Sequence, residues 1–322
     1  MKENRKICIL GYDALEIDLV EKFDLPNLKQ DEYGKIDISD FETVYTPILW
    51  GSFLTGENLE PHFREDEGSK LLQKFFHSPY KFIKKNVSGK IAVSLKRHLK
   101  NLGVVGKVEG NVSSKNVAKD LEKETILDLV EKSKAINVPS LNRNRSKESS
   151  MKDRIEGKTS DSEYQKSVWA CFEDTKRKLL ENLDRELVMA WFGLADWMGH
   201  VYRGDMDEMR KTYEALDDFA GEVKRRFDGL VLIVADHGMN QLGSYGDHTD
   251  MNYGYYSSSI ELGLKHPKMT EFYDIIEGII TGNFDPRKYS HEELGESEDE
   301  EDFEGDEEEE IKKRLEELGY FD

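Results

Sequence analysis

The stretch Leu230-Val-Leu-Ile-Val-Ala-Asp236-His237-Gly238-Met239 decides the fold class of this chain. Its first six residues are apolar and rich in Val, Leu and Ile, which is typical of a strand buried on both faces. The run is too short for a fully buried helix, and Gly229 and Gly238 bracket it. Strands of this kind occur in mostly parallel sheets covered by helices on both faces, so we predict an α/β fold.

Asp236 and His237 follow this strand directly, and both side chains are metal ligands by chemistry. In open α/β sheets, ligands bind outside the carboxyl ends of the strands. Gly238 then lets the backbone turn close to a bound group. A simpler interpretation is that Asp236 caps a turn and His237 packs in the core. The other segments of the sequence are needed to choose between this interpretation and a metal site.

The whole chain has 322 residues, which indicates one large α/β domain or a core with an insertion. Its net charge of -20 disfavours general binding to nucleic acid or to anionic membranes. The two cysteines, Cys8 and Cys171, stand in apolar surroundings and are interpreted as buried thiols. Because no signal peptide or membrane-spanning run is recognisable, we expect a cytoplasmic protein.

Two N-terminal segments carry candidate site residues. Lys6–Leu10 is predicted to be the first strand, and Asp13 lies just beyond its end, although a helix N-cap explains Asp13 equally simply. Thr46 followed by Pro47 predicts a helix start, and Gly56 predicts its end. The Thr46 hydroxyl would lie at the positive end of this helix, which favours anions and an alkoxide; an ordinary capping role is the alternative.

The second half of the chain supplies the remaining candidates. Glu186–Phe192 is predicted to be another buried strand, and Asp196 and His200 follow it. Their spacing puts both side chains on one face of a helical turn, where they could share a metal ion or form a plain surface pair. His248 lies in a later loop that opens at Gly246.

The composition changes along the chain and suggests its organisation. Residues 1–61 and 119–291 are predicted to form the core, and 62–118 a helical, lysine-rich insertion or lid. Residues 292–310 hold fourteen acids and no basic residue, so 292–309 is predicted to be a disordered segment rather than a calcium site. Residues 310–322 are predicted to form a C-terminal helix. Within the core we expect amphipathic helices at 119–132, 163–183 and 205–227, a short strand at 134–139, a loop at 142–157 and a pocket-lining segment at 252–258.

Five motifs taken together resemble the alkaline phosphatase superfamily, in its type I phosphodiesterase/nucleotide pyrophosphatase branch. They are Gly-Tyr-Asp13, Thr46 ten residues before Gly56, Asp196-Trp-Met-Gly-His200, Asp236-His237-Gly-Met and Gly-Asp-His248. The resemblance covers roughly residues 5–60 and 120–260. It implies an alkaline-phosphatase-like fold with two divalent metal ions, usually zinc, with manganese or magnesium as alternatives.

The resemblance also implies a role for each site residue. Asp196, His200 and His248 would hold one metal ion. Asp13, Asp236 and His237 would hold the other, together with Thr46. The Thr46 hydroxyl would be the nucleophile, and water would then hydrolyse a phospho-threonine intermediate.

The sequence departs from this branch in the residues after the nucleophile. The branch supplies an asparagine there to bind a phosphoryl oxygen, but Leu49 follows Thr46 by three residues and no asparagine occurs before Gly56. Trp50, Ser52 or a group from the insertion would have to replace it. The cysteine motif of related sulfatases and the membrane spans of related lipid transferases are not recognisable in the sequence.

Three functions follow from these observations. The first is a two-metal phosphodiesterase or nucleotide pyrophosphatase that acts on a small phosphorylated substrate. The second is a phosphomonoesterase or phosphomutase on the same scaffold. The third is a non-catalytic binding protein of the same fold. We expect neither a nucleic acid scaffold nor a membrane as partner, and the oligomeric state is left open.

Overall fold

The computed structural model describes residues 6–63, 123–143, 154, 157–242, 245–248 and 251–292. The chain divides into two compact units, residues 1–59 with 115–322, and residues 60–114. Of the second unit, the described part is the short helix α4 (Glu60–Phe63). The predicted insertion at 62–118, the acidic segment at 292–309 and the terminal helix at 310–322 lie almost wholly outside the described residues and stay predictions.

The first unit is built on a six-stranded sheet with the strand order β2-β8-β5-β1-β4-β3. Strands β3, β4, β1 and β5 pair in parallel, whereas β8 is antiparallel to both of its neighbours. Only β8 therefore runs against the others in this sheet, and the predicted mostly parallel α/β fold is confirmed. The strands are β1 (Ile7–Tyr12), β2 (Glu32–Asp37), β3 (Ser133–Ile136), β4 (Leu187–Phe192), β5 (Leu230–Ala235) and β8 (Tyr253–Ser258).

The three central strands are buried along their whole length, as the apolar runs predict. Gly11 of β1 stands level with Trp191 of β4 and with Val234 of β5. Because the three strands are parallel and in register, their carboxyl ends meet at one edge of the sheet. The residues that follow these strands are thus brought together there.

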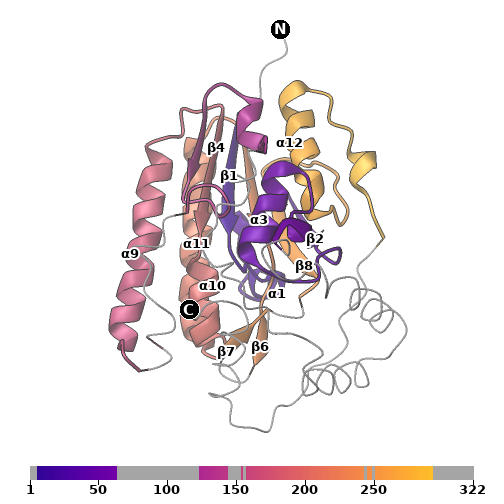
Figure 1. Ribbon diagram of the computed structural model, residues 1–322. Coiled ribbons are helices and arrows are strands. Elements are labelled where there is room, and N and C mark those ends of the chain that lie inside the picture. The colour runs from indigo at the N-terminus through magenta and orange to yellow at the C-terminus, as the bar shows by residue number, and fades with distance from the viewer. Residues whose placement is uncertain are drawn as a thin grey trace, which may run out of the picture. The chain divides into compact units, whose positions relative to one another are not determined.

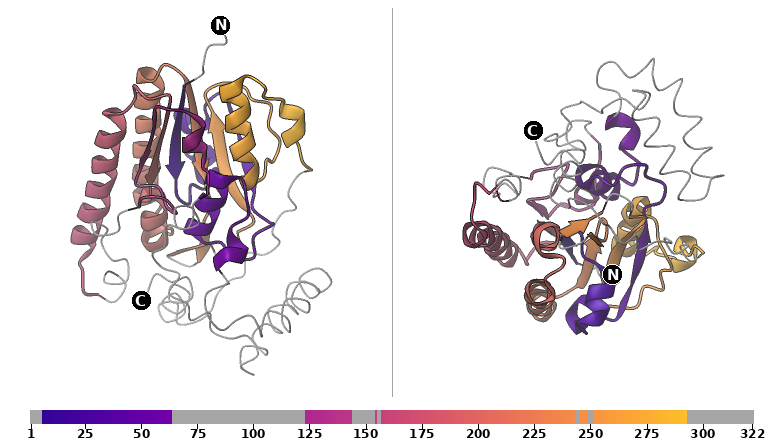
Figure 2. Two further views of the ribbon diagram at one scale, coloured as in Figure 1. Left: turned by 45° about the horizontal axis from the view of Figure 1, so that its top comes forward. Right: turned by 90° about the horizontal axis from the view of Figure 1, so that it is seen from below.

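Helices cover both faces of the sheet (Figures 1 and 2). On one face, Phe172, Phe192 and Phe219 form an aromatic cluster between the long helices and β4. On the other face, Trp50 lies over Gly11, where an added Cβ atom would come within 2.8 Å of the indole ring. The first face carries α1 (Ile17–Lys22), α2 (Pro26–Lys29), α9 (Asp161–Leu180) and α11 (Met206–Arg226), and the second carries α3 (Thr46–Thr55) and α12 (Phe272–Thr281).

Short elements complete the unit, and most lie near the loops between strands. They are α10 (Leu194–Tyr202), the hairpin β6 (Asn240–Leu242) and β7 (Tyr245–Asp247), and the 3-10 helices η1 (Ile126–Leu129), η3 (Met269–Glu271) and η4 (Pro286–Tyr289). Both α10 and the hairpin belong to the carboxyl edge, because α10 follows β4 and the hairpin follows β5.

Within the described residues one predicted element is wrong, and a segment predicted without an element type forms a strand. The helix expected at 119–132 is only the 3-10 turn η1 in its described part, where a capping box of Thr125 and Asp128 precedes the nearby start of β3. The segment at 252–258 forms the strand β8 over Tyr253–Ser258, and its pocket-lining role stays a prediction. Its tyrosines point to opposite faces, since Tyr255 donates to the Leu28 carbonyl and Tyr256 to the Leu264 carbonyl.

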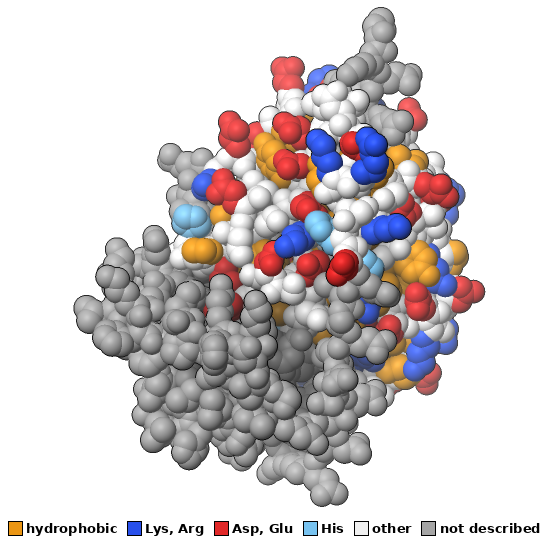
Figure 3. Space-filling view, turned by 90° about the vertical axis from the view of Figure 1, so that its right-hand side faces the viewer, with side chains coloured by type: hydrophobic (Ala, Val, Ile, Leu, Met, Phe, Trp, Pro, Cys, Tyr) orange, Lys and Arg blue, Asp and Glu red, His pale blue; other side chains and the backbone are white. Residues whose placement is uncertain are grey.

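Nowhere in the described ranges is a helix both long enough and apolar enough to span a bilayer. Figure 3 shows the side of the molecule that carries α12. Acidic and basic side chains are interspersed among the coloured residues of this face, and neither sign forms a continuous patch there.

Candidate metal centre

Six predicted metal ligands lie at the carboxyl edge of the sheet. Asp13 follows β1, Asp236 and His237 follow β5, and His248 follows β7. Asp196 and His200 lie on α10, which begins two residues after β4 ends. All six side chains are buried, with at most 1% of each residue exposed. Polar groups this deeply buried require partners, so their shared location indicates a common ligand.

The ligand atoms form two overlapping groups. Asp13, Asp236 and His237 place one ligand atom each within 4.8 Å of one another, and so do Asp196, His237 and His248. His237 Nε2 lies 3.2 Å from Asp13 Oδ1 and 3.6 Å from Asp236 Oδ2. His237 therefore stands between the groups, and its ring stacks on that of His248 with centroids 4.1 Å apart.

His200 belongs to the second group through Asp196. Its Nε2 lies 3.1 Å from Asp196 Oδ1, and its ring centroid lies 5.1 Å from that of His248. The structure thus brings together all six residues that the sequence singled out. It also places His237, which the resemblance assigned to one metal only, within reach of both groups.

Backbone carbonyls fix the tautomers of two histidines. His200 Nδ1 lies 3.0 Å from the Gly246 carbonyl oxygen, and His237 Nδ1 lies 2.9 Å from that of Gly238. A carbonyl oxygen can only accept, so each Nδ1 carries a proton and donates. In the neutral rings Nε2 then presents its lone pair to the cluster, as in histidines that bind metal ions.

The buried carboxylates dominate the electrostatics of the cluster. Burial raises the pKa of Asp236, and the neighbouring Asp13 carboxylate raises it further. Burial lowers the pKa of His237, but Asp236 and Asp13 outweigh this effect and raise it to about 10. Burial opposes ionisation of Asp196, yet His200 and His248 hold the pKa of Asp196 below its ordinary value. The raised pKa values of Asp236 and His237 indicate that this part of the site favours a cation, whether a proton or a metal ion.

Unsatisfied oxygens show that the residues fit metal ions. Among the described residues, both carboxylate oxygens of Asp236 and Oδ1 of Asp13 are buried without a hydrogen-bond donor. Such carboxylates cost several kcal/mol unless a cation compensates them. Oxygen and imidazole ligands of this kind suit zinc and related divalent ions.

Thr46 is the first residue of α3, and the structure corrects its predicted capping role. Tyr45 is the N-cap, and its carbonyl accepts from the backbone N–H groups of Ile48 and Leu49. The first turn of α3 lies at the carboxyl edge, because Ser140, just after β3, donates a hydrogen bond to the Pro47 carbonyl. Thr46 is therefore at the same edge of the sheet as the six ligands, and only 5% of the residue is exposed.

The residues expected to replace the missing asparagine have packing roles. Trp50 is fully buried against β1, and the Ser52 hydroxyl accepts from the Leu59 backbone N–H at 3.0 Å. The sequence reasoning missed one cation, Arg143, that stacks on a ring of β4. The Arg143 guanidinium carbon lies 4.0 Å above the Trp191 ring, and Trp191 packs on Trp197, the neighbour of Asp196.

A second missed residue is Glu16, three residues after Asp13. It is 2% exposed, and burial raises its pKa. Its carboxylate accepts from the Met239 backbone N–H at 2.8 Å and from the Tyr253 hydroxyl at 3.0 Å. The sequence held one signal for it, an acidic residue in a loop after a buried strand, but no spacing pattern marked it.

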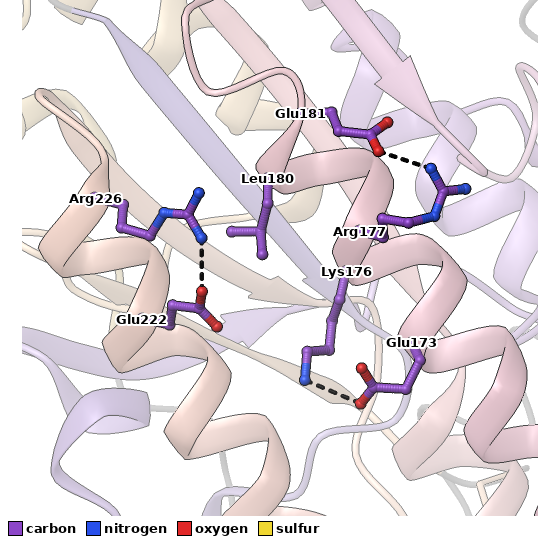
Figure 4. A pocket seen from close by; sticks show the side chains of 7 residues that line it. All are labelled: Glu173, Lys176, Arg177, Leu180, Glu181, Glu222 and Arg226. Atoms are coloured by element: carbon purple, nitrogen blue, oxygen red, sulfur yellow. Dashed lines mark hydrogen bonds and ion pairs between the residues drawn. The ribbon is translucent and has the colours of Figure 1, made fainter.

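A groove is lined by side chains of α9 and α11 (Figure 4). It is near the ends of these helices that lead into β4 and β5, so it belongs to the opposite edge of the sheet. Its charged side chains pair locally, with Lys176 on Glu173, Arg177 on Glu181 and Arg226 on Glu222. The groove thus offers little uncompensated charge for a ligand.

The fold and the site define an α/β protein with a candidate metal centre at the carboxyl edge of its sheet. A family model described as type I phosphodiesterase / nucleotide pyrophosphatase matches residues 96–303. The chain therefore belongs to this family and is a phosphoric ester hydrolase. The match contains Asp196, His200, Asp236, His237 and His248, whereas Asp13 and Thr46 precede it.

Comparison with solved structures gives distant neighbours. Alkaline phosphatase from the Antarctic bacterium TAB5 is 11% identical, with a TM-score of 0.44, over 87% of this chain and 99% of that chain. Murine ectonucleotide pyrophosphatase / phosphodiesterase 5 is 15% identical, with a TM-score of 0.38, over 74% of this chain and 58% of that chain. A search of curated proteins found no match.

Proposed function

We propose that the protein is a two-metal phosphodiesterase or nucleotide pyrophosphatase that acts on a small phosphorylated substrate through a phospho-threonine at Thr46. The observation that carries the proposal is the buried cluster of three carboxylates and three imidazoles, with the first turn of α3 at the same edge of the sheet. Family membership supports the hydrolysis of phosphoric esters.

The two ligand groups suggest how the ions would be held. Asp13, Asp236 and His237 would bind one divalent ion, and Asp196, His200 and His248 the other. We propose zinc, with manganese or magnesium as alternatives. When bound, the ions would supply Lewis-acid charge that favours a threonine alkoxide and a departing oxygen.

In this proposal the Thr46 hydroxyl is the nucleophile. Its hydroxyl loses a proton, and Oγ1 then forms a bond to phosphorus while the opposite ester oxygen leaves with its electron pair. Water next attacks phosphorus, the bond from phosphorus to Thr46 Oγ1 breaks, the phosphate product leaves, and Oγ1 takes up a proton given up by the water. The positive end of the ten-residue helix α3 favours negative charge on this hydroxyl and on the phosphoryl group.

Arg143 is our candidate for the group that replaces the missing asparagine. A guanidinium stacked on an indole keeps its N–H donors in its own plane, the geometry that suits an anion such as a phosphoryl group. Arg143 lies three residues after Ser140, whose hydroxyl donates a hydrogen bond to the Pro47 carbonyl at the start of α3. Trp191, the ring on which Arg143 stacks, packs beside Trp197. We infer that Arg143 binds a non-bridging phosphoryl oxygen or a second phosphate of the substrate.

Substitution of Thr46 tests the proposed intermediate. We expect Thr46→Ala to abolish turnover of bis-p-nitrophenyl phosphate while Thr46→Ser retains much of it. Because Tyr45 and not Thr46 caps α3, Thr46→Ala loses mainly one buried methyl group, about 1 kcal/mol of stability. Rapid quench with a labelled diester, followed by mass spectrometry, should find phosphate on Thr46 in the wild type.

The same assay distinguishes the competing functions. Faster turnover of the p-nitrophenyl monoester than of the diester would favour a phosphomonoesterase. Wild-type turnover by Thr46→Ala would show that a water-derived nucleophile attacks directly, and the phospho-threonine mechanism would then be wrong.

A further inference from the structure

Glu16 connects the two loops that carry the first ligand group. It lies in the loop after β1, three residues beyond Asp13, and it accepts the backbone N–H of Met239 in the turn after β5. The other oxygen accepts the Tyr253 hydroxyl at 3.0 Å and the Asp18 backbone N–H at 3.3 Å. The carboxylate also fills the space beside Gly238, where an added Cβ atom would collide with Glu16 Oε2.

Met239 extends this connection to the second ligand group. An added Cβ atom on Gly199 or on Gly246 would collide with the Met239 sulfur, so this side chain is wedged between both backbones. Gly199 immediately precedes His200, and the Gly246 carbonyl accepts the His200 Nδ1 proton. The backbone that Glu16 holds at Met239 therefore bears directly on the position of His200.

We propose that Glu16 is a positioning residue that sets the metal affinity of the site by fixing the turn from Asp236 to Met239. The proposal rests on the proposed function, because it assumes that the six ligands bind metal ions. Glu16 acts on those ligands through the backbone that carries them, by way of the Met239 N–H group. Residues that orient ligands typically change metal affinity about 10- to 100-fold when they are replaced.

The chain offers a matched control for this test. Glu32 is also a carboxylate that accepts backbone N–H groups, from Leu262, Gly263 and Leu264. It accepts a tyrosine hydroxyl as well, that of Tyr256 at 3.3 Å. Glu32 lies at the start of β2, however, and ties an edge strand to a loop that carries none of the six ligands.

The experiment measures the affinity of the full-length protein for zinc alone and for manganese alone, by competition with a chromophoric chelator. We expect Glu16→Gln to weaken the affinity about 10- to 100-fold, since one amide oxygen cannot accept at both carboxylate positions. We expect Glu32→Gln to leave the affinity within about twofold of wild type, although it should also lower the melting temperature. Added metal should restore part of the activity of Glu16→Gln.

Tyr253→Phe provides a milder variant that should fold even if Glu16→Gln does not. It removes one of the three donors to Glu16 and should weaken metal binding several-fold. Equal affinity in wild type, Glu16→Gln and Tyr253→Phe would overturn this inference alone. An equal loss in Glu32→Gln would also overturn it, because the effect would then be global. A wild-type protein that binds no divalent ion would overturn the proposed function itself.

Discussion

Arg143 combines a stacking contact with a charge near the proposed phosphoryl site, and substitution can separate the two. Arg143→Met keeps a long side chain on Trp191 but removes the donors. We expect it to raise KM and the inhibition constant of inorganic phosphate about 10- to 100-fold, as for a lost hydrogen bond to a charged group. Arg143→Lys should fall between this variant and wild type, because a single ammonium replaces the planar fork.

Arg210 supplies the control for that comparison. Its guanidinium lies 4.5 Å from the centroid of the Phe23 ring, on the face of the sheet that carries α1 and α11. Arg210→Met should therefore leave phosphate inhibition unchanged. If Arg143→Met weakened phosphate binding no more than Arg210→Met does, the role of Arg143 would be packing on Trp191.

At the residue scale, the sequence indicated five of the six clustered ligands because each follows a strand or lies one helical turn from another ligand, and it indicated His248 through the resemblance of the Gly-Asp-His248 motif. That logic could not indicate Arg143, whose position depends on a ring contributed by β4. It could not indicate Glu16 either, because its partners Met239 and Tyr253 come from the far end of the chain. The positions of such residues depend on contacts between segments that are distant in the sequence. Local sequence patterns carry no information about those contacts.

Helix α3, which begins at Thr46, and strand β1, which precedes Asp13, meet at Gly11. An alanine there would place its Cβ 2.8 Å from the Trp50 ring, which is fully buried and cannot move aside. We expect Gly11→Ala to shift α3 relative to β1, to cost about 1–3 kcal/mol and to lower kcat at least tenfold. Metal affinity should stay close to wild type, because the shift moves the nucleophile and not the ligand loops.

Circular dichroism melting measures the stability of Gly11→Ala and of its control, and metal titration measures their metal affinity. The control for this shift is Gly34→Ala. Its added Cβ would meet the Tyr256 ring at 3.1 Å, in an edge strand away from the cluster. We expect a loss of stability with unchanged kcat. An unchanged kcat in Gly11→Ala would contradict the idea that the contact between Trp50 and Gly11 sets the position of Thr46.

At the scale of helices and strands, the sequence predicted the buried strands β1, β4 and β5 and the long helices α9 and α11, because their apolar patterns are strong. It missed β2, where Glu32, Gly34, Lys35 and Asp37 break the alternation typical of a half-buried strand. It also missed β8, whose tyrosines and serines resemble a loop until both faces are seen to pack. Edge and antiparallel strands depend on pairing, which local composition describes poorly.

For the molecule as a whole, the raised pKa values predict how stability depends on pH without metal. The pKa of His237 is raised from 6.5 to about 10, and that of Asp236 is also raised. A raised pKa stabilises the folded state below the unfolded value and loses this effect as pH rises through the folded value. The melting temperature of chelated protein should therefore fall between pH 6.5 and about 10.

Added zinc should flatten or reverse this slope, because metal ions bind the deprotonated ligands. His237→Gln in chelator should also show a smaller slope than wild type. His291→Gln serves as the control, since His291 pairs with Glu271 outside the cluster. Differential scanning calorimetry across this pH range measures all three variants. An equal slope in chelated wild type and His237→Gln would show that the cluster does not hold the proton.

The position of β1 between β4 and β5 has a consequence for folding during synthesis. The strand made first is apolar along its whole length, yet both of its partners in the sheet come from beyond residue 186. On the ribosome it must wait, unpaired, until more than half of the polypeptide has emerged, and such waiting strands are prone to misassociation. His248 emerges later still, so the complete ligand set can form only after almost all of the sheet has been synthesised. Metal loading would then report that the nascent chain has finished folding.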